Sequence, residues 1–142
     1  MKRRHLFEIA DQVWCPTLLR DFVTDYLEHV YEPIVEPLQR AVKAARAECV
    51  IDLCSGGGGA WRQMEKSFTG QCPAVKIYLT DLHPNKSVRE RLRQLSGDTI
   101  KVHSASVNAL RVPPELKGFR TLFSSFHHFT PAEARAILRD AV

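Results

Sequence analysis

Short apolar runs alternate with stretches of helical spacing after residue 48, and this alternation constrains the fold more than any other feature of the sequence. Strands are predicted at 49–53, 75–80, 99–103 and 119–125, and helices at 60–68, at 86–95 and from Pro131, with Thr130 as N-cap and Glu133 at the third position. Strands joined by helical crossovers pair in parallel, with helices on both faces of the sheet. We therefore predict an α/β fold, a doubly wound, mainly parallel Rossmann-like sheet. Its ligand site should lie beyond the carboxyl ends of the strands.

Two helices are predicted before this sheet. Apolar residues recur at three- and four-residue steps over 16–31, which predicts an amphipathic helix. A second helix is predicted from about Ile34 or Pro37 up to residue 47. Pro37 is expected in its first turn only, because proline lacks the N–H that a helix interior needs. The sequence thus divides into an N-terminal helical extension, 1–47, and a partial Rossmann-like domain, 48–142.

Charge and composition argue against several classes of protein. The 20 Lys and Arg residues outnumber 16 Asp and Glu, a net charge of +4, and they alternate with acids instead of clustering. Charge therefore gives no reason to infer nucleic-acid binding. No apolar run reaches the ~20 residues that span a bilayer, and the N-terminus lacks the apolar core of a secretory signal. The four cysteines lack zinc-site spacing, so no metal is expected and a cytoplasmic location is the default.

The first predicted strand runs directly into four glycines, Gly56–Gly59. Such a run costs backbone entropy and makes sense where the chain turns tightly and a ligand touches the main chain. A dinucleotide loop needs a third glycine where this sequence has Trp61 or Arg62, and a Walker loop needs Gly-Lys-Ser/Thr, which is missing. Asp52, just before the glycines, would repel a pyrophosphate but suits a ligand that carries an ammonium group.

A second carboxylate, Asp81, ends the second predicted strand. A carboxylate at this position can accept hydrogen bonds from both ribose hydroxyls of a nucleoside. The alternative is that Asp81 caps the turn that follows it, as Asp often does. The glycine loop one strand away favours the ribose interpretation.

These residues resemble the motifs of class I S-adenosylmethionine-dependent methyltransferases. The resemblance covers 48–142, with about four strands present and the later strands missing. Asp52 matches the acid of the first motif, and Gly56 and Gly58 match its second and third glycines, while Cys54 replaces the first glycine. Asp81 matches the ribose-binding acid. The resemblance implies the fold, the methyltransferase activity and S-adenosyl-L-methionine as the cofactor.

The resemblance also implies which residues bind that cofactor. Asn108 stands where the third motif has an acid, and its amide oxygen can still accept a hydrogen bond from the adenine amino group. The implied cofactor-binding residues are Asp52, Cys54, Ser55, Gly56, Gly57, Gly58, Asp81, Leu82, Asn108, Ala109 and Ser124.

The exit from the fourth strand, 122–129, lies where the family places the transferred methyl group. Methyl transfer is an in-line displacement, so the protein mainly positions the donor and the acceptor and supplies a base where the acceptor must lose a proton. His127 and His128 are the candidate catalytic bases, since histidine titrates near neutral pH. The alternative is that one of them packs or hydrogen-bonds to the backbone.

The acceptor is expected to be a small molecule. The exit from the fourth strand lacks the Asn/Asp-Pro-Pro-Tyr of amino methyltransferases that act on nucleic acids, and no cysteine follows a proline as in cytosine C5 enzymes, so no DNA substrate is expected. Two alternatives stay open: an NAD-linked oxidoreductase, and a non-catalytic domain that keeps the fold for interaction. Within this sequence the outer edge of the fourth strand is expected to be apolar and unpaired. We expect a missing C-terminal part, self-association or a partner to cover it.

Overall fold

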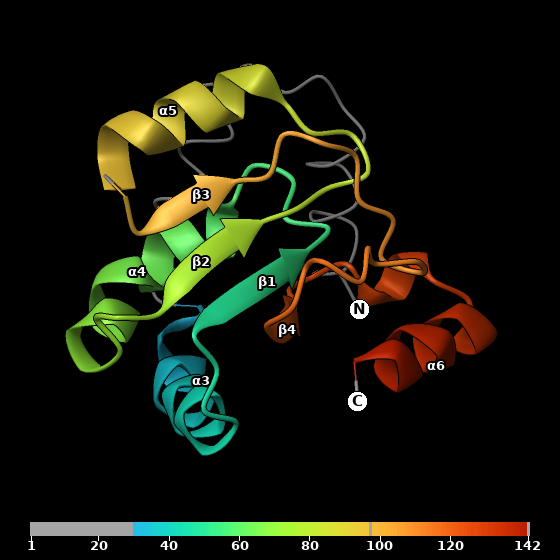
Figure 1. Ribbon diagram of the computed structural model, residues 1–142, viewed down its shortest axis with the longest axis horizontal. Helices are drawn as coiled ribbons and strands as arrows, with labels where there is room; N and C mark the ends of the chain where they lie inside the picture. Colours follow the sequence, from blue (N-terminus) through green and yellow to red (C-terminus); the bar gives the residue numbers. More distant parts are fainter. Residues whose placement is uncertain (1–29, 97, 142) are drawn as a thin grey trace, which may run out of the picture. The chain divides into compact units, whose positions relative to one another are not determined.

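The computed structural model describes residues 30–96 and 98–141 (Figure 1). The helix predicted over 16–31 falls almost wholly outside them. The elements follow the chain as α3 (Glu32–Ala44), β1 (Cys49–Leu53), α4 (Gly59–Gln71), β2 (Lys76–Leu79), α5 (Lys86–Ser96), β3 (Ile100–Val102), β4 (Phe119–Leu122), the 3-10 helix η1 (Phe126–His128) and α6 (Pro131–Asp140).

The four strands form one parallel sheet in the order β3-β2-β1-β4. Strand β1 is central, and its Ile51 lies between Tyr78 of β2 and Arg120 of β4. The chain adds β2 and β3 on one side of β1 and returns to add β4 on the other. The predicted doubly wound α/β sheet is confirmed, and the reversal of strand order beside β1 marks where such sheets bind ligands.

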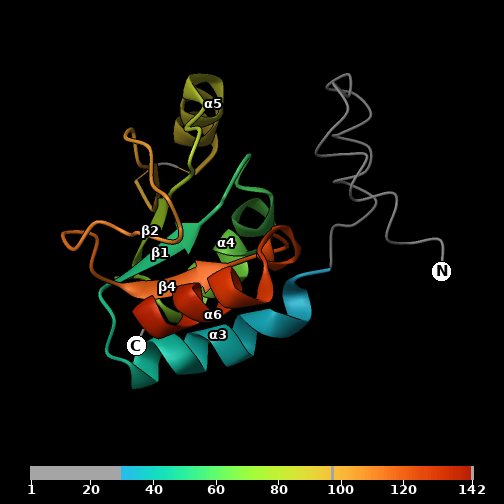
Figure 2. The ribbon, with the colours of Figure 1, turned by 90° about the vertical axis from the view of Figure 1, so that its right-hand side faces the viewer.

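Each face of the sheet carries its own apolar cluster, because successive side chains of a strand point to opposite faces. Val50 of β1 packs with Val35 and Val42 of α3 and with the buried face of α4. Ile51 and its neighbours pack on the other face with the 107–112 segment and with α6. Figure 2 views the ribbon from the side of β4, with α6 in front.

Helix α3 packs within the first of these clusters. The Gln39 amide donates hydrogen bonds to the main-chain carbonyls of Ser67 and Phe68 on α4, at 2.8 and 3.2 Å. The predicted domain boundary between residues 47 and 48 stays a prediction. The position of Pro37 was predicted wrongly, because α3 begins at Glu32 and Pro37 lies in its interior. Pro37 is exposed, so water can reach the carbonyl that loses its intrahelical partner.

The end of β4 also differs from the prediction, because the strand stops at Leu122 instead of Ser125. Ser124 adopts a left-handed conformation, φ 56°, which ends the extended backbone and leads into η1. The predicted cap of α6 is confirmed: the Glu133 N–H donates to the Thr130 hydroxyl, and the Glu133 carboxylate accepts from the Thr130 N–H at 2.8 Å.

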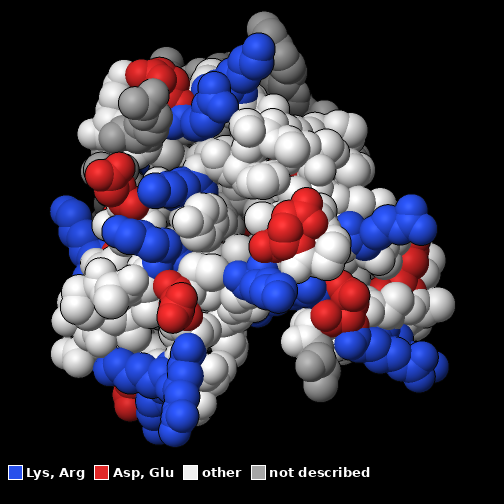
Figure 3. Space-filling model, in the orientation of Figure 1, with Lys and Arg blue, Asp and Glu red and all other residues white. Residues whose placement is uncertain are grey.

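Strand β4 pairs with β1 and, within the described residues, with no strand on its other side. A cavity of about 510 Å³ opens there, lined by Ala45, Ala47, Gly118, Phe119, Arg120 and Ala141. That a C-terminal part, self-association or a partner covers this edge stays a prediction. On the face drawn in Figure 3, basic side chains are interspersed with acidic ones. None of the described helices is long and apolar enough to cross a membrane.

Candidate functional site

The loop after β1 turns through alternating left-handed residues. Cys54, Gly56 and Gly58 have φ angles of 55°, 51° and 71°. The Ser55 N–H donates to the Thr80 carbonyl at the end of β2 at 2.9 Å, and the Gly58 N–H donates to the Ser55 carbonyl at 2.7 Å. The loop is therefore held against the neighbouring strand.

The glycines of this loop divide into two kinds. A Cβ on Gly58 would lie 2.8 Å from Leu79 Cδ1 and 3.2 Å from Leu92 Cδ1, so Gly58 lets α4 pack on β2 and α5. A Cβ on Gly56 or Gly57 would meet nothing within 4 Å, and both glycines are exposed. The space beside both glycines is thus open, and the predicted contact of a ligand with their main chain stays a prediction.

Asp52 is buried beneath the loop, with 2% of its surface exposed. Its Oδ2 accepts a hydrogen bond from the Ser55 hydroxyl and its Oδ1 accepts one from the Thr121 hydroxyl of β4, both at 2.7 Å. One carboxyl group therefore connects β1, the glycine loop and β4. The predicted contact of Asp52 with a ligand's ammonium group stays a prediction.

Burial raises the pKa of Asp52 to about 6, against the hydrogen bonds from Thr121 and Ser55 and the nearby Trp61 indole, which lower it. The indole nitrogen is buried and has no hydrogen-bond partner of normal geometry among the described residues. The carboxyl is therefore protonated more readily in the folded protein than in the unfolded chain.

A folded-state pKa above the unfolded value of 3.8 gives this carboxyl a stabilising effect that is complete below pH 3.8 and is lost as the pH rises to about 6. We expect the unfolding free energy of the wild type, minus that of Asp52→Asn, to fall by up to about 3 kcal/mol between pH 4 and pH 7. Urea denaturation at a series of pH values measures this difference. Asp98→Asn, which removes an exposed carboxyl, is the matched control, and a difference that rises with pH would contradict the argument.

Asp81 stands at the tip of β2 and faces the loop. Its Oδ2 accepts from the Gly56 N–H at 2.9 Å and its Oδ1 accepts from the His83 N–H at 2.8 Å. The second bond is the turn cap considered as the alternative, and the first connects the two strand ends. A carboxylate offers further lone pairs, so Asp81 can cap this turn and still accept from a ligand.

A small hollow lies beside this contact. Its volume is about 10 Å³, and its lining residues are Ser55, Gly56, Leu79, Thr80, Asp81, Pro84, Asn85, Val88 and Val102. That volume holds about one water molecule. A nucleoside therefore has to lie over the open edge or displace the side chains of the 82–85 turn.

The exit from β3 lies beside the exit from β2. The Val107 N–H donates to the Asp81 carbonyl at 2.9 Å, and the Ser106 hydroxyl donates to the Leu82 carbonyl at 2.6 Å. Leu82 is 47% exposed. The exposed Asn108 already accepts a local hydrogen bond, at 2.9 Å, from the main chain two residues further on, while Ala109 is buried in the core. Leu82, predicted to bind the cofactor, and Asn108, predicted to contact adenine, are thus carried by adjoining segments.

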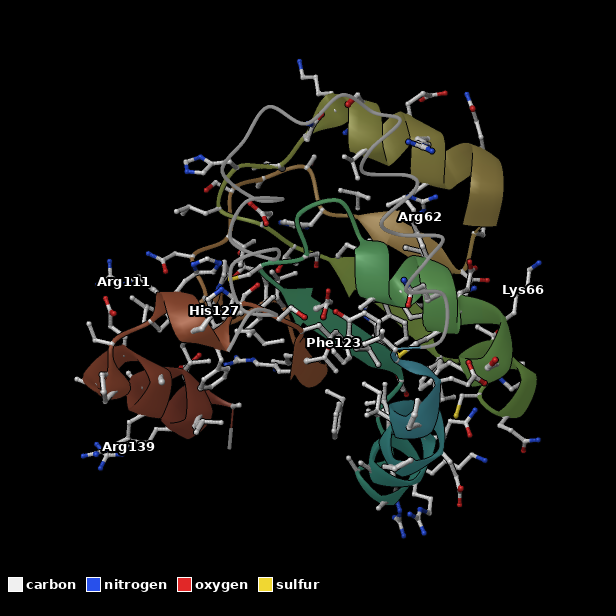
Figure 4. All side chains as sticks on the ribbon, turned by 180° about the vertical axis from the view of Figure 1, so that it is seen from behind. Arg62, Lys66, Arg111, Phe123, His127 and Arg139 are labelled. Atoms are coloured by element: carbon white, nitrogen blue, oxygen red, sulfur yellow. The ribbon has the colours of Figure 1, made fainter. Side chains whose placement is uncertain are left out.

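The predicted bases lie on η1, beyond β4. The imidazole rings of His127 and His128 are exposed, with centroids 4.0 Å apart (Figure 4 labels His127). Their catalytic role stays a prediction.

Burial, together with the negative charges of Asp81 and Asp52, raises the pKa of Cys54 to about 11, so this thiol is not a nucleophile at neutral pH. Within the described ranges no group of three or more His, Cys, Asp or Glu side chains could hold a metal ion.

Sequence reasoning missed two residues that shape this site. Thr121 of β4 donates to Asp52, and the buried Thr80 donates its hydroxyl to the Asp52 carbonyl at 2.9 Å. A threonine in each predicted strand that flanks β1 was the available signal, but nothing local showed that both face the same aspartate.

A parallel sheet in this order, with a glycine loop after β1 and an acid at the tip of β2, is the Rossmann-like fold that the sequence predicted, and solved methyltransferase structures share it. No protein-family model matches the sequence, and no curated protein matches it.

Solved structures do match. An O-methyltransferase family protein from Burkholderia thailandensis superposes with a TM-score of 0.57 at 23% identity, over 86% of this chain and 36% of that one. PigF, solved with SAH, matches with a TM-score of 0.53 at 18% identity, over 83% and 34%. SAM-bound CalS10, an amino pentose methyltransferase from Micromonospora echinaspora, matches with a TM-score of 0.51 at 16% identity, over 89% and 50%. The chain thus spans half or less of the length of these proteins.

Proposed function

We propose that this chain binds S-adenosylmethionine and is the cofactor-binding part of a methyltransferase that acts on a small molecule. The observation that supports this most directly is the 2.9 Å contact between the Asp81 carboxylate and the Gly56 N–H. It joins the two predicted cofactor-binding elements at the carboxyl edge of the sheet, where doubly wound folds bind ligands.

The residues present suit this cofactor. Asp81 would accept hydrogen bonds from the ribose, and the exposed main chain of Gly56 and Gly57 would receive the amino-acid portion. Leu82 offers an exposed apolar surface to the adenine, and Asn108 offers an exposed amide. When bound, the cofactor supplies an activated methyl group on a cationic sulfonium.

The descriptions of two structural neighbours support the proposal of a small-molecule acceptor. One is described as an O-methyltransferase family protein and another as an amino pentose methyltransferase. For this chain we propose an acceptor of that general kind, bound beside η1. His127 or His128 would there accept the proton of an acceptor hydroxyl as it is methylated.

Titration calorimetry with S-adenosylhomocysteine tests the proposal. We expect the wild type to bind and Asp81→Asn to bind at least about tenfold more weakly, because a charge-assisted hydrogen bond contributes about 1.5 kcal/mol or more. Asp98→Asn is the matched control, since it removes an exposed carboxyl from the turn before β3, at the opposite edge of the sheet. Equal affinities for wild type and Asp81→Asn would contradict the assignment.

The same titration with NAD⁺ tests the main alternative, an NAD-linked oxidoreductase. Trp61 occupies the position where a dinucleotide loop has its third glycine, and it is fully buried. We therefore expect no NAD⁺ binding. Binding of NAD⁺ in preference to S-adenosylhomocysteine would favour the oxidoreductase. Binding of S-adenosylhomocysteine with no methyl transfer to any small molecule would favour the non-catalytic domain.

A further inference from the structure

Two hydroxyl groups far apart in the sequence meet at the exit from β4. The Tyr31 hydroxyl and the Ser124 hydroxyl lie 2.7 Å apart, and either oxygen can be the donor. Whichever donates, the pair keeps one O–H and several oxygen lone pairs for a further partner. Tyr31 precedes α3 as its N-cap residue, yet its side chain makes no capping hydrogen bond, so its hydroxyl does not serve the helix.

The ring of Tyr31 is held by other aromatic side chains. It packs edge-on against Phe123 with centroids 5.7 Å apart, and Phe123 packs edge-on against the buried Trp61 at 6.0 Å. In Figure 4 Phe123 lies between η1 and α4. This row of rings extends from the core, and edge-to-face packing fixes ring orientation. The phenol oxygen of Tyr31 is therefore presented at a defined place.

Ser124 is held at the same edge of the sheet as the glycine loop. It follows β4 with φ 56°, and Cys54 follows the adjacent β1 with φ 55°. The Ser125 hydroxyl donates to the Phe123 carbonyl at 3.1 Å and also lies 3.4 Å from the Cys54 carbonyl, so the two strand exits are close together. Non-glycine residues in left-handed conformation are strained, and such residues gather at functional sites.

The order of the strands gives the hydroxyl pair its place relative to a bound cofactor. Asp81 at β2 would hold the ribose and the loop after β1 would hold the amino-acid portion. The sulfur joins these two portions of the cofactor, and its methyl group has to face away from both. The exit from β4 lies on the side of β1 opposite to β2.

From this arrangement we propose that the hydroxyl oxygens of Tyr31 and Ser124 bind the methyl end of the cofactor, an inference that rests on the proposed function. A methyl group on a sulfonium carries partial positive charge, and oxygen lone pairs stabilise such C–H groups. The pair would orient the methyl group toward an acceptor on the η1 side. Tyr31 and Ser124 are thus assigned to the site as cofactor-binding residues.

Two cofactor analogues test this in the full chain. S-adenosylhomocysteine has no methyl group, whereas sinefungin carries a protonated amine in its place and can donate hydrogen bonds to the hydroxyl oxygens. We expect Tyr31→Phe to weaken sinefungin binding about tenfold while changing S-adenosylhomocysteine binding less than about threefold. Ser124→Gly should do the same, because glycine accepts the left-handed conformation. Calorimetry measures both ligands.

Tyr78→Phe is the matched control, because it removes a tyrosine hydroxyl from the middle of β2. It should leave the ratio of the two affinities unchanged. Equal weakening of both ligands by Tyr31→Phe, or no change in either, would overturn the inference and leave the proposed function standing, because the pair would then serve packing alone. Failure of the wild type to bind either analogue would overturn both.

Discussion

Replacing Trp61 by alanine is expected to lower the unfolding free energy by about 3–5 kcal/mol, the usual cost of truncating a fully buried large aromatic side chain. Trp61 is 0% exposed and packs edge-on against Phe68 at 5.2 Å and Phe123 at 6.0 Å. Its removal leaves a cavity between α4 and the exit from β4. Urea denaturation followed by circular dichroism at 25 °C measures the loss.

The matched control is an exposed apolar residue. Leu138 on α6 is 57% exposed, so Leu138→Ala should change the unfolding free energy by no more than about 0.5 kcal/mol. Trp61→Phe should cost less than Trp61→Ala, since it keeps part of the packing and removes the unpartnered indole N–H. A loss below about 1 kcal/mol in Trp61→Ala would contradict the packing of α4 described above.

The second large effect is expected at Gly58. An alanine there would have to adopt the left-handed conformation, which costs about 1–2 kcal/mol. Its methyl group would also overpack the core, which typically costs about 1–3 kcal/mol. The φ angle of Gly58 is 71°, and the added carbon would lie 2.8 Å from the buried Leu79 side chain. We therefore expect Gly58→Ala to lower the unfolding free energy by about 2–5 kcal/mol in the same denaturation experiment.

Substitution of the neighbouring Gly57 is expected to affect ligand binding more than stability. A Cβ on Gly57 meets nothing within 4 Å, so Gly57→Ala should change the stability by less than about 1 kcal/mol. The methyl group would stand on the open main chain of the loop, and we expect it to weaken S-adenosylhomocysteine binding. If Gly57→Ala destabilised the protein as much as Gly58→Ala, the division of the loop into a packed and an open part would be wrong.

Much of the fold could be predicted because its signals are local. Strand β1 has the predicted bounds, since the apolar run Cys49–Leu53 is limited by glycines on one side. Helix α6 begins where the Thr130 and Glu133 capping box predicted. The prediction for Pro37 was wrong because local rules exclude proline from a helix interior. Burial of Val35 and Val42 against the sheet keeps α3 helical through Pro37.

The candidate site was predictable only in part. Asp81 and the glycines could be placed at neighbouring strand ends, because parallel strands end at one edge. The partners of Asp52 could not be predicted, since a carboxylate before a glycine loop can face a ligand or the protein. In the structure Asp52 contacts Thr121 and has 2% of its surface exposed, and its role in cofactor binding stays a prediction.

The sequence by itself determined the order of strands and helices and the residues that stand at the strand ends, because hydrophobic period, caps and glycines act within a few residues of the chain. Only the tertiary structure decided which of those residues meet. Asp52 and Thr121 are 69 positions apart, and Tyr31 and Ser124 are 93 apart. The first contact depends on the register between β1 and β4, and the second depends on how the residue before α3 lies against the exit from β4.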